Sequence, residues 1–444
     1  MKSMRVSLAA TIAFAGLISA LPAPARAIPA GNALTEWNLI AVNTLIAIPG
    51  PSGGAPPAAQ IHMGMVAGAV YDAVNATEPK HHRPYLLNRR FSARASQEAA
   101  IVTAAYDVLS NIVSTVPGTT ITFPNRATLL ASLLTQRNAW LDAIPDSPFK
   151  RQGMAAGEAA ADAMIAARLN DGRFGPSQWV PSTAKGHWEP LLTPMGAQIL
   201  DPTPWVGGVQ PFLMQSSSQF RSAGPYVLTS PEYAADFNEV YALGAAPPHA
   251  TTRTADQTHI ALFWQSSPVN TWNYVARNLV TNPTYNVSLA DSARLFAMMN
   301  LSGADAAINC WNDKYHFDFW RPVGAIHRAL EDDNPLTAPD TTWAALINAP
   351  YPDHTSGHMC LDGAHLRVME MFFGTDAISF GVPSIPFPGE IRPFNSFDAA
   401  LDEIESARVW AGLHFRNADE QGRLLGKNVA DYMASHYFQP VGNH

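Results

Sequence analysis

Two cationic side chains stand seven residues apart in the stretch KYHFDFWRP, which runs from Lys314 to Pro322. On an ideal helix, seven residues return to nearly the same face, about 20° away. Pro322 disfavours helix at the residue before it, so we expect Arg321 to lie where a helix ends or bends. A fixed pair of cations among aromatic rings suits an oxyanion, because charge acts more strongly where water is excluded. Two salt-bridged surface residues would give the same spacing.

A second cluster is PYPDHTSGH, from Pro350 to His358, which directly precedes a predicted helix. The start of a helix exposes backbone N–H groups and favours an anion, and Ser356 adds a hydroxyl there. Gly357 allows a ligand to approach the backbone closely. His358 could act as an acid or base, because imidazole titrates near neutrality. The alternative is that Ser356 only caps the helix and that the histidine is structural.

Three histidines of this region, His354, His358 and His365, have spacings of four and seven that also occur in metal sites. Neither an HExxH pattern nor a carboxylate at a matching place accompanies them, so the sequence disfavours zinc.

The third cluster is SARVWAGLHFRNADEQG, which contains Arg408 and His414. Six residues on an ideal helix leave these two side chains about 120° apart, so we expect His414 at a helix end with the ligand between them. Alternatively, Arg408 pairs with Glu405 or Asp402, and His414 interacts with a helix C-terminus.

Helix-like apolar spacing recurs along the chain, whereas no segment alternates as a strand would and no repeat or glycine-rich phosphate loop is present. The sequence therefore predicts an all-α fold. The predicted helices are Glu36 to Ile48, Ala58 to Asn75, Ser96 to Ser114, Thr128 to Ala143, Lys150 to Leu169, Pro231 to Leu243, Thr254 to Leu279, Ser288 to Trp311, Ser356 to Phe373, Ser396 to Leu413 and Asn417 to Tyr437. From Arg173 to Ser230, residues rich in Pro, Gly, Trp and Ser predict a long ordered connection wrapped on the helices.

The composition allows a large core, with 47% hydrophobic and 14% charged residues among 444. The formal net charge of −8 argues against nucleic acid as a partner. Residues 1–27 are typical of a cleavable signal peptide, with Lys2 and Arg5 before an apolar run and Ala25-Arg26-Ala27 at its end. We therefore expect a secreted or periplasmic protein. No later run is long enough to span a membrane, so we expect the mature chain to be soluble.

Two cysteines, Cys310 and Cys360, flank the candidate site. An exported protein permits a disulfide between them, and two buried free thiols are the alternative.

Taken in order, the three clusters resemble the motifs of the vanadium-dependent haloperoxidase and type 2 phosphatidic acid phosphatase superfamily, namely K-x6-RP, PSGH and SR-x5-H-x3-D. The first motif matches fully. Stretches such as MVAGAVYDAVNA, RTADQTHIALFW and FWRPVGAI extend the likeness to the bacterial haloperoxidase-related branch over most of the mature chain.

The chain departs from these motifs at three places. Thr355 replaces the proline of PSGH, and Ser406 lies one place too early because Ala407 precedes the arginine of the third motif. Ala418 stands where the family has Asp, with Asp419 one place further on. If the family Asp orients the histidine, either Asp419 substitutes from a shifted backbone position or His414 is held less well.

The resemblance implies a vanadate-dependent haloperoxidase, which uses hydrogen peroxide to oxidise halide to hypohalous acid that then halogenates a small organic acceptor. His414 would be the vanadium ligand and His358 the acid–base residue. The residues expected to hold vanadate are Lys314, Arg321, Ser356, Gly357, Arg408 and His414. Tyr351 and Trp320 would lie near the halide, with His354 as a second nearby imidazole.

Two other functions stay open. The same cage could hold phosphate, which would make the chain an exported phosphatase with His414 as nucleophile and His358 as leaving-group acid. A non-catalytic oxyanion-binding protein is the third possibility. The resemblance implies a single domain over 28–444, with supporting helices and the connection in 28–245 and the site-bearing bundle in 246–444. It implies two four-helix-bundle-like halves and leaves the oligomeric state open.

Overall fold

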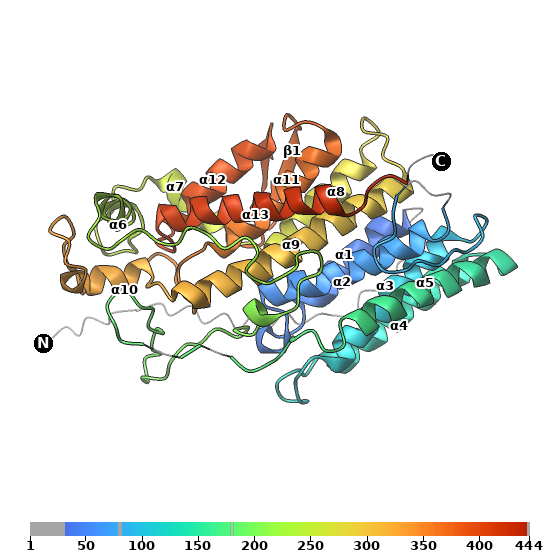
Figure 1. Ribbon diagram of the computed structural model, residues 1–444, viewed down its shortest axis with the longest axis horizontal. Coiled ribbons are helices and arrows are strands. Elements are labelled where there is room, and N and C mark those ends of the chain that lie inside the picture. Colours follow the sequence, from blue (N-terminus) through green and yellow to red (C-terminus); the bar gives the residue numbers. More distant parts are fainter. Residues whose placement is uncertain (1–31, 79–81, 178, 181, 442–444) are drawn as a thin grey trace, which may run out of the picture.

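The computed structural model describes residues 32–78, 82–177, 179–180 and 182–441 of the chain (Figure 1). Its helices are α1 (Ala33–Ile46), η1 (Gly50–Ser52), α2 (Pro56–Asn75), α3 (Gln97–Thr115), α4 (Arg126–Ala143), α5 (Pro148–Ala167), η2 (Val206–Gly208), α6 (Pro231–Leu243), α7 (Ala255–Phe263), α8 (Pro268–Thr281), α9 (Leu289–Phe317), α10 (Pro322–His327), η3 (Ala329–Glu331), α11 (Gly357–Phe373), α12 (Phe397–Trp410) and α13 (Arg416–His436). The strands are β1 (Phe380–Pro383) and β2 (Ile391–Phe394). The predicted all-α class is therefore confirmed, with one small hairpin added.

The amino-terminal helices α1 to α5 form one bundle, in which α3 and α5 pack closely. Small residues permit this contact. A Cβ on Gly153 would lie 2.2 Å from the Ser96 carbonyl oxygen, and one on Gly157 would lie 2.5 Å from that of Ala100. The bundle supports α2, whose residues 57–74 are all buried.

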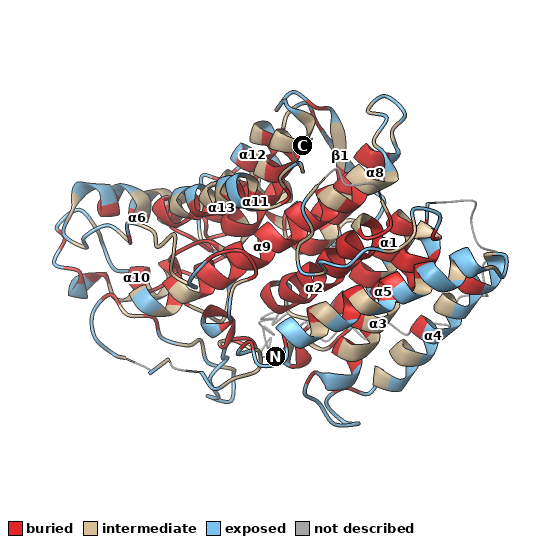
Figure 2. Cartoon of the chain, turned by 45° about the vertical axis from the view of Figure 1, so that its right-hand side comes forward, coloured by how far each residue is buried: buried red, intermediate tan, exposed pale blue. Residues whose placement is uncertain are grey.

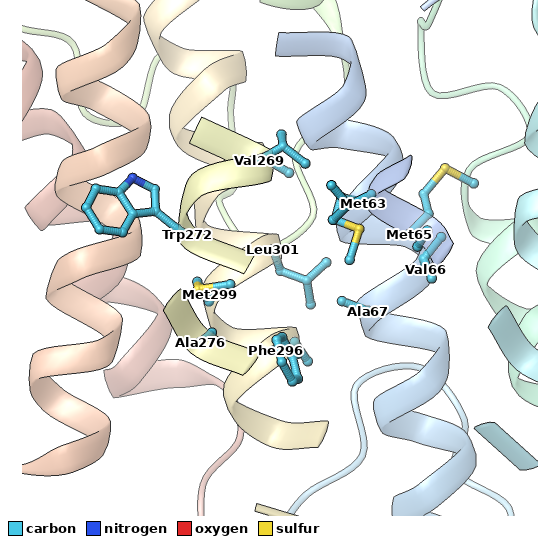
Figure 3. Packing of buried hydrophobic residues seen from close by; sticks show 14 of the residues in the cluster. Met63, Met65, Val66, Ala67, Val269, Trp272, Ala276, Phe296, Met299 and Leu301 are labelled. Atoms are coloured by element: carbon cyan, nitrogen blue, oxygen red, sulfur yellow. The ribbon is translucent and has the colours of Figure 1, made fainter. Parts of the chain in front are cut away.

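Helix α9 is the central element of the molecule, 29 residues long and buried along most of its length (Figure 2). It packs on α2 on one side and on α11 and α13 on the other. Figure 3 shows the apolar layer between these elements, where Leu301 and Met299 of α9 lie between Met63 of α2 and Trp272 of α8. Both bundles therefore share one core.

The predicted helix from Thr254 to Leu279 is wrong in one respect, because the structure divides it into α7 and α8. Pro268 begins α8, where its missing N–H leaves no hydrogen bond unmade, and the chain turns at residues 264–267. Thr254 forms a capping box with Gln257 at the start of α7. This turn contributes to the candidate site.

The expectation that no segment forms a strand is also wrong. Strands β1 and β2 pair antiparallel, with Phe380 opposite Phe394, in the proline-containing segment between two predicted helices. A pair of strands consists only of edges, so Pro383 and Pro393 leave no central ladder incomplete. The ring of Phe380 stacks on Phe397 of α12 at 5.2 Å, and this contact attaches the hairpin to the bundle.

The segment that follows α5 runs over the helices as an ordered connection, as the sequence predicts. The buried carboxylate of Asp305 on α9 accepts the backbone N–H groups of Phe212, Leu213 and Met214 at 2.6–2.8 Å. Asp313, also on α9, accepts the Ser222 N–H and pairs with Arg221.

Within the described part of the chain, no helix is long and apolar enough to cross a membrane. The predicted signal peptide, residues 1–27, lies outside the described residues. The division of the mature chain at residue 245 stays a prediction.

Candidate oxyanion site

Lys314 lies in the last turn of α9, and its ammonium group is fully buried. Its Nζ donates to the carbonyl oxygens of Pro352 at 2.9 Å and Asp353 at 3.0 Å, and also to that of Thr355. Burial lowers the pKa of Lys314 to about 8. The ammonium group therefore holds together the loop that leads into α11.

Arg321 binds the same loop from the N-cap of α10. The chain turns between the two cations at Asp318, which has a φ of 47°. The guanidinium donates to the carbonyl oxygens of Tyr351 at 2.8 Å, Leu413 at 2.7 Å and Pro352 at 3.3 Å. Both cations are buried, so the surface salt-bridge alternative is wrong.

The N-terminus of α11 presents free donors. Ser356 occupies the N-cap position, but its side chain makes no capping hydrogen bond, and its buried hydroxyl has no partner. The alternative in which Ser356 only caps the helix is therefore wrong. At Gly357 an added Cβ would lie 3.2 Å from the Trp311 ring, so glycine keeps this approach open. A hydroxyl beside the unpaired N–H groups of a helix N-terminus can bind an anion.

Arg408 lies in the last turn of α12 and is 4% exposed. Its Nη1 donates to the Trp264 carbonyl oxygen at 3.0 Å, and its buried Nε has no partner. The alternative pairing with Glu405 or Asp402 is wrong, because these carboxylates bind other arginines. Of the three cations, Arg408 has the fewest hydrogen bonds to protein, so it has the most donors left for a ligand.

His414 lies between α12 and α13, and its Nδ1 is 2.8 Å from Oδ1 of Asp353. The carboxylate therefore fixes Nδ1 as the donor and leaves Nε2 for a ligand. Burial, followed by the charges of Arg321 and Lys314, lowers the pKa of His414 well below its usual value. Arg408 and His358 act in the same direction, so these side chains surround the ring. Burial raises the pKa of Asp353 to about 7.

Of the two alternatives for the family Asp, the one in which Asp419 orients this histidine from a shifted position is wrong, because Asp353 holds His414. Asp419 lies instead beside Ser356 and Arg408, fully buried, and neither carboxyl oxygen has a hydrogen-bond partner with good geometry. Burial raises its pKa well above the usual value, and the nearby Ser356 hydroxyl and Arg408 oppose this only in part. Burial thus shifts Asp419 toward its protonated form, which would repel an oxyanion less than the carboxylate would.

Sequence reasoning missed Asp353, although it lies in the second cluster, three residues before Ser356. The only signal for Asp353 in the sequence was its position between the first motif and the second. Its partner His414 is 61 residues away, so the pairing depends on the tertiary fold.

His358 lies in the first turn of α11 with its ring partly exposed. Its Nε2 is 3.3 Å from the carbonyl oxygen of Ser266, in the turn between α7 and α8. A carbonyl can only accept, so Nε2 carries the proton, and Nδ1 of the neutral ring is the acceptor. Burial, followed by Arg408, lowers the pKa of His358 well below its usual value.

The other residues named from the sequence, Tyr351, Trp320 and His354, lie in different surroundings. The Tyr351 ring lies 5.0 Å from Arg321 and 5.1 Å from Lys314, within the cage. Trp320 packs in an apolar cluster with Trp343, and its place near the halide stays a prediction. His354 is buried, and its Nε2 forms a 2.9 Å hydrogen bond with the Ser222 hydroxyl.

The described residues contain no group of three metal-binding side chains, and His365 is buried apart with neither ring nitrogen paired. Cys310 and Cys360 are free thiols, with the Thr355 hydroxyl 3.4 Å from one sulfur and 3.3 Å from the other. Of the two alternatives, the structure therefore has the free thiols.

Together these residues fit a tetrahedral oxyanion such as vanadate. Two orphaned buried donors, Ser356 Oγ and Arg408 Nε, occur beside the α11 N-terminus. The neutral His414 ring adds a lone pair at Nε2, which can coordinate a metal centre. Lys314 and Arg321 contribute charge and hold the loop rather than supplying most of the hydrogen bonds.

Comparisons with known proteins show what this chain is similar to. Residues 294–443 match the family model of the VCPO second helical-bundle domain. The vanadium chloroperoxidase of Curvularia inaequalis is 24% identical over 202 residues, which cover 38% of this chain and 32% of that protein. The match thus spans about a third of the length of this relative.

Among solved structures, a bacterial vanadium-dependent iodoperoxidase aligns with a TM-score of 0.69 at 21% identity, covering 92% of this chain and 98% of that one. A holo-type bacterial vanadium-dependent chloroperoxidase aligns with a TM-score of 0.68 at 15% identity, covering 88% and 93%. These similarities establish a shared helical fold over most of the chain.

Proposed function

We propose that this chain belongs to the vanadium haloperoxidase superfamily, to which its family-model match, curated relative and structural neighbours are similar, and that it is a vanadate-dependent haloperoxidase, oxidising halide with hydrogen peroxide to hypohalous acid. The observation that carries the proposal is the His414 ring, whose Nδ1 is held by Asp353 while cations surround it. A neutral imidazole with a fixed tautomer is a good metal ligand.

His414 would bind vanadium through Nε2. Ser356, the Gly357 N–H and Arg408 would donate to the oxygens, with Lys314 and Arg321 supplying further positive charge. When bound, vanadate supplies a Lewis-acid centre that activates peroxide toward halide. The buried cations of the chain would stabilise negative charge on its oxygens, because burial reduces screening by water.

His358 would carry the proton transfers. Its Nε2–H is committed to the Ser266 carbonyl oxygen, so the neutral ring can accept a proton from hydrogen peroxide only at Nδ1. The resulting imidazolium returns that proton readily, because burial and Arg408 lower its pKa.

A phosphatase is the second candidate, because the same donors fit phosphate. An imidazole held by a carboxylate is also the arrangement of an activated nucleophile. A non-catalytic oxyanion-binding protein is the third, and it has support from Lys314, whose three donors already bind carbonyl oxygens. Export after cleavage at residue 27 remains part of the proposal.

The test is bromination of phenol by the purified protein with hydrogen peroxide and bromide, after loading with vanadate or with phosphate. Hydrolysis of p-nitrophenyl phosphate is measured in parallel. We expect vanadate-dependent bromination that is lost in His414→Ala and kept in His316→Ala, an exposed histidine of the same region. Hydrolysis of p-nitrophenyl phosphate without bromination would assign the site to phosphate-ester chemistry. Vanadate binding without either reaction would favour the binding protein.

A further inference from the structure

The β1–β2 hairpin has a proline-containing tip that the site chemistry above does not use. Seven residues lie between the strands, and Glu390 is the one charged residue among them: Ser384, Ile385, Pro386, Phe387, Pro388, Gly389 and Glu390. The two prolines restrict the backbone of this tip. Ile385 exposes 49% of its surface at this tip.

Several contacts fasten the tip to α7 and the turn after it. The Ile385 N–H donates to Oγ of Ser266 at 2.8 Å, and the Ser384 hydroxyl donates to the Phe263 carbonyl oxygen at 2.9 Å. The Phe387 ring lies 4.4 Å from the ring of His259. The exposed isoleucine is therefore displayed on a fixed support.

The same turn holds two residues of the oxyanion site. Ser266 accepts the His358 Nε2–H through its carbonyl oxygen at 3.3 Å, and the Trp264 carbonyl oxygen accepts from Arg408 at 3.0 Å. Ser266 thus connects the Ile385 backbone to the acid–base histidine through two hydrogen bonds. The hairpin tip lies beside the part of the site where His358 is partly exposed.

From this placement we infer that the hairpin tip is the binding lip for the organic acceptor and that it selects neutral aromatic compounds. The inference rests on the proposed function. An apolar side chain fixed beside the site stabilises an aromatic ring by removing apolar surface from water. No charged group lies between Ser384 and Gly389 to attract an ion, and the following Glu390 is committed to His259 at 2.8 Å.

The reaction at this lip balances without a further reactant. Hypobromous acid transfers bromine to a ring carbon of the acceptor, the carbon loses its proton, and water leaves. The lip acts by holding the ring near the place where hypobromous acid is formed.

The test compares the parent protein with Ile385→Ala and with Ile391→Ala, a matched control. Ile391 belongs to the same hairpin and is also 49% exposed, but it lies against Gly381 on the strand pair. We expect Ile385→Ala to raise the KM for phenol about five- to tenfold at saturating bromide and peroxide, because apolar contact area is lost. Triiodide formation from iodide, which needs no organic acceptor, should change less than twofold. The control should keep both values.

Equal KM values for phenol in all three proteins would overturn the inference, since hypobromous acid would then react away from the protein. A parallel loss of triiodide formation would also overturn it. Phenol binding to the resting protein is measured by ligand-observed NMR without peroxide. This measurement tests the acceptor-binding lip independently of the haloperoxidase proposal. If no halide is oxidised but Ile385→Ala weakens phenol binding, the lip stands while the haloperoxidase proposal fails. Equal binding by the parent and Ile385→Ala refutes the lip.

Discussion

Replacing Asp353 by asparagine tests how His414 is held. The carboxylate and the imidazole are 1% and 3% exposed, and their contact is 2.8 Å long, so solvent screens it little. A buried hydrogen bond to a charged group contributes about 1.5–3 kcal/mol. Asparagine keeps the shape but removes the charge, which allows the Nδ1 and Nε2 tautomers to compete. We therefore expect vanadate affinity to fall about 10- to 100-fold.

The measurement is a vanadate titration followed by 51V NMR, with a thermal melt of each protein to establish that the variant remains folded. Asp419→Asn is the matched control, because Asp419 is an equally buried carboxyl of the same cage that does not contact the histidine. It should bind vanadate no more weakly than the parent does. If Asp419→Asn loses affinity while Asp353→Asn keeps it, the assignment of the orienting carboxylate is refuted.

Three further predictions concern stability. Ser356→Ala should change the free energy of unfolding by less than about 0.5 kcal/mol but weaken vanadate binding, because Ser356 makes no capping hydrogen bond. Ser396→Ala, which removes a capping hydrogen bond of α12, should lower the free energy of urea unfolding by about 1 kcal/mol. Equal losses of stability in the two variants would contradict the capping geometry. Burial raises the pKa of Asp362 from 3.8 to about 7, so the folded state binds the extra proton between these values and the parent loses stability as pH rises. Relative to the parent, Asp362→Asn should gain up to about 4 kcal/mol (3.2 pKa units at about 1.36 kcal/mol each) between pH 4 and 8 in urea unfolding, and a constant difference would refute the shift. Gly303→Ala would place a Cβ 2.3 Å from Nε2 of His365, so Tm should fall by several degrees in a thermal melt, and an unchanged Tm would show that the ring can move aside.

The helices could be predicted from the sequence because their apolar spacing and end signals are local. Gly374, for example, ends α11 with a φ of 73°, as expected for a glycine after a helix. The division of the helix at Pro268 was also present in the sequence, since proline favours the first turn over the interior. The hairpin was missed because its prolines obscure strand alternation, and its pairing depends on attachment to α12.

At the candidate site, the sequence predicted the residue types better than their bonding. Lys314 and Arg321 do lie together, but they bind carbonyl oxygens of the loop that leads into α11, and residue spacing does not encode those partners. Residue spacing likewise does not encode that Asp353, rather than Asp419, contacts His414. Both carboxylates are close to the site along the chain, and only the packing of α13 on α11 decides which one faces the histidine.

The shared position of α9 limits how this protein can be divided. The site-bearing helices α11 and α13 cover one side of α9, and α2 covers the other, so the amino-terminal bundle is a structural part of the site rather than a detachable module. Residues 294–443 begin inside α9, and taken alone they would expose the apolar surface that Leu301 and its neighbours present to α2. Exchanging one bundle for that of a relative would require matched changes along this helix. Sequence divergence at the site can therefore proceed freely only where it leaves α9 unchanged.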